Sequence, residues 1–202
     1  STLIDGVVAI IMTLVVLSIQ VPELKGALSN QAFLNVLISL KDKFIVYLVT
    51  FVVLASIWNS NAKQMNYMKF FDKKMFALKI IWLFFITLIP FSATFLSNHN
   101  QYLIPNLFFN INIFVIALLS TISWQYIIKF DFIKEKPIKN TDLISIRSIL
   151  FLLCTMAAIA LSFIAPRFST LAYLFPNIII FIAKKINPNL ANSTKLGIRK
   201  IP

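Results

Sequence analysis

Long apolar runs separated by short polar segments dominate this chain. Each run is close to, or extendable to, the roughly 20 residues that a helix needs to cross a bilayer. The runs are Val7–Val21, Phe44–Trp58, Met75–Leu96, Phe108–Ile128, Ile144–Ala165 and Leu171–Ala183. The pattern therefore predicts an all-α polytopic membrane protein with six transmembrane helices, together with a short helix over Asn30–Lys41 at the outer surface.

The composition excludes most soluble classes. Hydrophobic residues make up 59% of the 202 positions and charged residues only 13%. A water-soluble domain could not bury so much apolar surface. Phenylalanine alone occurs 20 times, which suits surfaces that face lipid or pack against other helices.

The basic residues are distributed unevenly between the two sides of the predicted bundle. The net charge is +12, from 19 basic and 7 acidic residues. Only Lys25, Lys41, Lys43 and Arg167 lie on one side, and the other fifteen follow the second, fourth and sixth runs. Because basic loops stay in the cytoplasm, we expect both termini to be cytoplasmic in a protein of the cell membrane. The charge then reflects topology and contact with membrane lipid, and no nucleic-acid partner is expected.

The fifteen basic residues expected on the cytoplasmic side follow three of the apolar runs. They are Lys63, Lys69, Lys73, Lys74 and Lys79 after the second run, Lys129, Lys134, Lys136, Lys139 and Arg147 after the fourth, and Lys184, Lys185, Lys195, Arg199 and Lys200 after the sixth. The chain shows no internal duplication. We therefore expect one six-helix transmembrane domain over residues 1–185 and a basic cytoplasmic tail over residues 186–202.

No constellation of catalytic residues is evident. Cys154 is the one cysteine and His99 the one histidine, which excludes a disulfide framework and argues against a metal site. Paired carboxylates, HExxH, GxSxG, a Walker loop and a Ser/His/Asp set are also absent. We expect neither an enzyme nor a bound cofactor. A TVGYG potassium filter is missing as well, so any conduction must use another device.

The first apolar run has a continuous aliphatic stripe. At about 100° per residue, one face of the helix collects Gly6, Ile10, Leu14, Leu17 and Val21, with Thr13 and Gln20 at its margin. Asp5 points about 140° away from Ile10 on the same arithmetic. Several copies around an axis would form a hydrophobic constriction, which can gate a pore by dewetting. The same stripe also fits ordinary helix packing, and the Thr13 hydroxyl can instead bond to its own helix.

The order of residues in this run is that of a known motif. Asp5-Gly6, Ala9-Ile10, Thr13-Leu14, Leu17 and Val21-Pro22 resemble the first-helix signature of the transmembrane protein 175 family, prokaryotic and lysosomal potassium channels. Further matches follow in the same order along the chain: Ser56-Ile57-Trp58, Ile89-Pro90-Phe91-Ser92-Ala93-Thr94, Ala165-Pro166 and Leu174-Phe175-Pro176. The resemblance is to the single-unit prokaryotic members, and it implies a homotetramer in which the first helix lines a central pore.

The resemblance also implies roles for individual residues. Ile10 matches the main pore constriction of the family, and Leu14 and Leu17 match further hydrophobic layers. Thr13 matches a pore-lining threonine tied to potassium preference, so that permeant potassium is the implied ion. Asp5, Trp58 and Asn61 match a polar network that positions the pore helix. This chain departs from the family at Leu3-Ile4, where the family has Phe-Ser, and at Asn61, where it has histidine.

Two functions of other classes remain as alternatives. A secondary transporter would use broken helices near the midplane, for which Pro176-Asn177 and Asn110 with Asn112 are candidates. A non-conducting membrane scaffold would need none of these features. A potassium-permeable channel with modest preference over sodium is the function that the resemblance implies.

Overall fold

The structure, a computed structural model, describes residues 2–17, 19, 21–22, 29–133 and 138–175, the side chains of 138–141 and 143 aside. Within these ranges the chain is helical throughout, apart from short links. The elements are α1 (Thr2–Val16), α2 (Asn30–Ser39), α3 (Lys41–Tyr67), α4 (Lys73–Thr87), α5 (Ile89–Asn98), α6 (Leu103–Lys129), α7 (Ile138–Ile164) and the 3₁₀ helix η1 (Pro166–Leu174).

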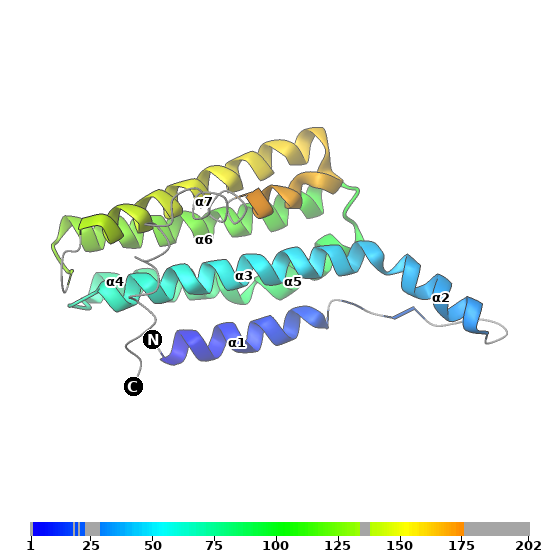
Figure 1. The fold of residues 1–202 in the computed structure, drawn as a ribbon, viewed down its shortest axis with the longest axis horizontal. Coiled ribbons are helices and arrows are strands. Elements are labelled where there is room, and N and C mark those ends of the chain that lie inside the picture. Colours follow the sequence, from blue (N-terminus) through cyan, green and yellow to red (C-terminus); the bar gives the residue numbers. More distant parts are fainter. Residues whose placement is uncertain (1, 18, 20, 23–28, 134–137, 176–202) are drawn as a thin grey trace.

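The long helices form an elongated bundle (Figure 1). α6 and α7 pack along one side, α3 and α5 lie in the middle, and α1 runs along the opposite edge. The start of α1, the α3–α4 link, the end of α6 and the start of α7 lie at one end, which we call the α3–α4 end. α2 extends from the other end, where the Arg167 guanidinium pairs with the Asp42 carboxylate at 2.7 Å.

Four described segments are long and apolar enough to cross a membrane. They are Lys41–Tyr67, Lys73–Asn98, Leu103–Lys129 and Ile144–Ile164. α1 is a shorter apolar helix of 15 residues. Of the predicted sixth span, Leu171–Leu174 belongs to η1, and residues from 176 onward, including the predicted tail, lie outside the described ranges. The described helices thus support a multi-pass membrane protein.

The predicted third span is divided into two helices. α4 ends at Thr87 and α5 begins at Ile89, with Pro90 in its first turn. Proline has no N–H to donate and its ring crowds the carbonyl of the preceding turn, so a helix breaks or kinks there. The sequence predicted one uninterrupted span because its apolar character continues across the break. The expected short surface helix is present as α2, which is capped by Ser29.

Lys79 corrects the sequence-based assignment of the basic residues. It was counted with the basic segment after the second apolar run, but it lies inside α4 with only 3% of its surface exposed. Its Nζ donates to the Asn61 Oδ1 of α3 at 2.7 Å and lies 5.4 Å from the ring centroid of Trp82. The buried ammonium therefore joins α3 to α4. Arg147, assigned to the same side of the membrane, likewise lies within α7.

A separate apolar cluster closes the α3–α4 end. It consists of Met68, Met75, Trp124, Ile127 and Ile144. Beside it, Asp72 caps α4 by accepting from the Met75 N–H at 2.8 Å, and it accepts from the Tyr126 hydroxyl at 2.5 Å. The Tyr126 and Met75 bonds lower the pKa of the Asp72 carboxyl below its ordinary value. The cap therefore stays ionised and links α4 to α6.

Substitutions at Asn61 and Lys79 should have unequal effects. Asn61→Leu leaves the buried Lys79 ammonium without its acceptor, which we expect to cost about 1.5–3 kcal/mol. Lys79→Met removes the charge itself and should cost less, because apolar replacements of buried ions are often near neutral. Thermal unfolding in detergent measures both. Equal losses, or a larger loss for Lys79→Met, would contradict a solvation role for Asn61.

Candidate pore-lining helix

α1 buries one face against the rest of the bundle. Ile4, Val8, Ile11 and Val15 recur at intervals of four, three and four residues and are at most 8% exposed. This spacing keeps them on one side of an α-helix. They join the main apolar core, and α1 contacts α3, α4 and α5.

The other side of α1 presents the predicted pore residues Ile10 and Leu14, and Leu17 follows directly after the last residue of the helix. Ile10 is 60%, Leu14 42% and Leu17 67% exposed. Gly6 lies on the same stripe, and a Cβ added there would meet nothing within 4 Å. Packing within the chain therefore uses the other face of α1. The stripe is left for lipid or for further copies of the chain.

Thr13 lies beside this stripe and is exposed. Its hydroxyl donates to the Ile10 carbonyl at 2.6 Å, the bond to its own helix that the sequence left open. A hydroxyl that donates its proton still has lone pairs to offer. The Thr13 oxygen can thus still act as an acceptor.

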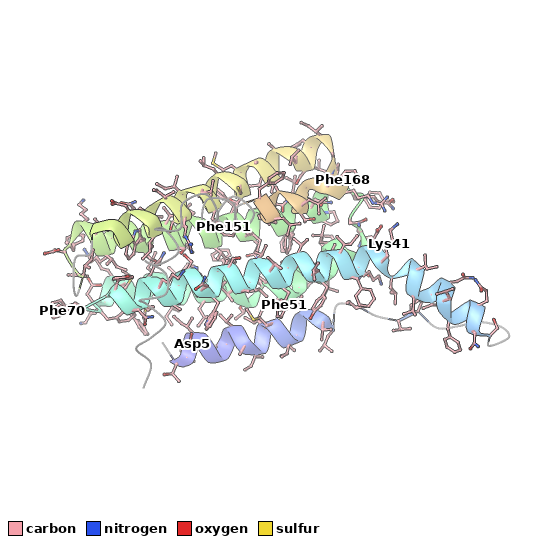
Figure 2. All side chains as sticks on the ribbon, viewed as in Figure 1. Asp5, Lys41, Phe51, Phe70, Phe151 and Phe168 are labelled. Carbon is pink, nitrogen blue, oxygen red and sulfur yellow. The ribbon has the colours of Figure 1, made fainter. Side chains whose placement is uncertain are left out.

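Asp5 and Trp58 are hydrogen-bonded to each other. The indole Nε1 of Trp58 donates to the Asp5 Oδ1 at 2.9 Å and so joins the first turn of α1 to α3. Figure 2 shows Asp5 at the start of α1, on the side of α3. A carboxylate in the first turn also interacts favourably with the helix dipole.

Asn61 has a different partner. It lies three residues after Trp58 on α3, but its side-chain oxygen accepts from Lys79 of α4. Trp58 therefore connects α3 to α1, and Asn61 connects α3 to α4. Sequence reasoning missed Lys79 as a participant. Its position inside an apolar run was the available signal, because charged residues within a bilayer normally have partners.

The side-chain amide of Asn110 is hydrogen-bonded to neighbouring helices through both its nitrogen and its oxygen. Its Nδ2 donates to the Ser162 Oγ at 2.7 Å and to the Ser169 Oγ at 3.1 Å, and its Oδ1 accepts from the Tyr173 hydroxyl at 2.8 Å. These bonds join α6 to α7 and η1. Asn112 points instead to Ser92 of α5, at 3.5 Å. The buried amide of Asn110 is therefore not offered to a transported substrate, and Pro176-Asn177 lies outside the described residues.

Comparisons with known proteins add two matches. The model of the endosomal/lysosomal potassium channel TMEM175 family matches residues 1–90, which include α1, α3 and α4. A crystal structure of a lysosomal potassium-selective channel TMEM175 homolog from Chamaesiphon minutus is similar at a TM-score of 0.76 and 23% identity. That similarity covers 92% of this chain and 95% of the other. No curated protein matches the chain.

The two matches differ in how much of the chain they cover. The family model matches the first-helix signature and the residues up to Pro90, and the structural similarity extends the shared fold to the helices that follow. The family consists of ion channels and not of enzymes. The resemblance of the first-helix motif to the TMEM175 potassium channel family is therefore confirmed over residues 1–90, and the chain shares the fold of a TMEM175 homolog.

Proposed function

We propose that this chain forms a potassium-permeable channel of the cell membrane, with α1 from each of four copies lining a central pore. The observation that supports this most is the exposed aliphatic face of α1, which lies within the segment matched by the family model. One α1 helix cannot enclose a pore, so self-association is part of the proposal. Both termini lie in the cytoplasm, as the basic residues at the α3–α4 end favour.

Ile10 forms the narrow waist of the pore, and Leu14 and Leu17 form further hydrophobic layers. All three side chains are exposed in the single chain and lie on one stripe of the first helix. A waist lined by aliphatic groups resists water, so an ion must lose part of its hydration shell to pass. Potassium loses water at lower cost than sodium, which gives a modest preference for potassium. Thr13 places one hydroxyl oxygen beside this waist.

The Asp5–Trp58 hydrogen bond sets the rotation of the pore helix. Packing of Ile4 and Val8 selects which face of α1 turns toward the bundle. The bond at 2.9 Å then adds a directional contact in the first turn of α1. Ile10 is thereby held toward the axis and away from lipid.

Ile10→Asn should raise potassium conductance several-fold and weaken selectivity against sodium. An amide at the waist provides hydrogen bonds to water, so it removes the dewetting barrier. Potassium and sodium flux into liposomes containing the purified protein measures both effects. Ile104→Asn is the matched control, because Ile104 is also exposed, at 66%, but lies at the start of α6.

Unchanged flux in the Ile10 variant would exclude Ile10 from the waist. If neither the wild type nor the variant gave any ion flux, although both formed particles of tetrameric mass, a non-conducting membrane scaffold would be favoured. Saturable uptake coupled to a substrate would favour the transporter.

Thr13→Val should lower the potassium-to-sodium flux ratio without stopping conduction, because valine has nearly the same shape but no oxygen. Thr13→Ser keeps the hydroxyl and should keep the ratio. Reversal potentials under bi-ionic conditions measure it. Equal ratios for wild type and Thr13→Val would remove Thr13 from selectivity.

Trp58→Phe and Asp5→Ala should impair conduction to the same degree, and the double variant should be no worse than either. Both changes remove the same hydrogen bond, so their effects are coupled rather than additive. The coupling free energy in thermal unfolding should be about 1 kcal/mol. Trp124→Phe is the control. It also removes an indole hydrogen bond, from Trp124 Nε1 to the Ser145 Oγ at 2.8 Å, but this bond joins α6 to α7 and does not involve α1. Additive effects of the two changes would refute the anchoring role.

A further inference from the structure

A cavity lined mostly by residues with polar side chains lies between α3, α6 and α7, and no residue of α1 lines it. Its volume is about 90 Å³, enough for a small polar group. The lining residues are Ser56, Asn59, Ser60, Lys63, Ala117, Ser120, Thr121, Ile144, Arg147, Ser148 and Phe151. Such a concentration of polar side chains inside an apolar bundle needs a physical reason.

Two cationic side chains reach the cavity from different helices. Lys63 comes from the last turns of α3 and Arg147 from the first half of α7, and none of the lining residues is acidic. Arg147 is half-buried and has no hydrogen-bond or ion-pair partner within the described part of the chain. A guanidinium held between helices without a partner is costly, because it loses water and gains nothing in return.

Hydroxyl groups surround these cations. The Thr121 hydroxyl donates to the Ala117 carbonyl at 2.9 Å and the Ser148 hydroxyl to the Ile144 carbonyl at 2.9 Å, which fixes both oxygens in place. The Ser120 Oγ accepts from the Gln64 Nε2 at 3.2 Å, so its own proton can be donated into the cavity. Two cations with the Ser120 hydroxyl as a donor beside them suit an anion with several acceptor oxygens.

We propose that this cavity is a phosphate-binding site. The guanidinium of Arg147 presents a planar pair of donors that fits two phosphate oxygens, and Lys63 adds a point charge from the facing helix. Both cations lie on the part of the cavity wall nearest the α3–α4 end, as the directions of α3 and α7 require. That end faces the cytoplasm in the proposed topology, where anionic lipids are concentrated and where basic pockets between transmembrane helices bind headgroups.

The phosphate has two possible sources, a lipid headgroup and a free phosphate ion. The position of the cavity between α3, α6 and α7 permits either source. The site does not depend on ion conduction, so its test uses binding as the readout.

Native mass spectrometry of the detergent-solubilised full chain tests the proposal with phosphatidylglycerol as the added lipid. We expect the wild type to retain the lipid and Arg147→Gln to bind it about tenfold more weakly, the loss expected for one charge-assisted contact. Arg147→Lys should bind between the two. Arg167→Gln is the matched control, because Arg167 is exposed and pairs with Asp42 at the opposite end of the bundle.

A second arm distinguishes the sources. If inorganic phosphate raises the melting temperature of the wild type but not of Arg147→Gln, and the lipid does not bind, the occupant is free phosphate. If Arg147→Gln fails to fold, Lys63→Gln replaces it in both arms. The proposal is overturned if phosphatidylglycerol and inorganic phosphate bind the wild type, the cavity variants and Arg167→Gln alike, or bind none of them, which would leave a water-filled cavity.

Discussion

The division of α1 into two faces is the constraint on which the rest of the structure depends. Ile4, Val8, Ile11 and Val15 are buried against the bundle, and the opposite stripe around Ile10 is left uncovered by the chain itself. Both faces are aliphatic, so apolar packing selects the buried face by shape and not by polarity. The bond from the Trp58 indole to Asp5 adds a directional contact between the first turn of α1 and α3, and in the proposed channel this contact holds the rotation of α1.

Polar contacts perform the same task throughout the bundle. Without a strong hydrophobic drive between helices in lipid, packing and interhelical hydrogen bonds select one arrangement. Lys79 with Asn61 joins α3 to α4, and the bonds of Asn110 join α6 to α7 and η1. Each such group would be costly if left alone in an apolar medium, which penalises other packings. The described partners do not complete this pattern at Arg147, nor at the buried side-chain atoms Gln64 Oε1, Trp82 Nε1 and Asn112 Oδ1.

Much of the fold could be predicted from the sequence. The apolar runs gave the positions of α3, α6 and α7 and the helical character of α1, because a helix in lipid must satisfy its own backbone. The stripe on α1 could be placed from periodicity as well. The point at which a helix breaks was harder to predict. The break between α4 and α5 at Leu88 depends on Pro90, and a hydropathy pattern does not detect the effect of a proline. Lys79 was misplaced for another reason: it was grouped with the lysines that precede it along the chain, although it lies inside an apolar run.

The sequence by itself determined the membrane class, the helical elements, the family motif of the first helix and which residues share its exposed stripe. These properties are local or periodic, and periodicity fixes which side chains share a face. Only the tertiary structure decided that the stripe around Ile10 is exposed while the Val8 face is buried. It also decided that Trp58 donates a hydrogen bond to Asp5 and that Asn61 accepts one from Lys79. Such choices depend on which helices become neighbours, and pairings between distant segments are set by packing and not by local pattern.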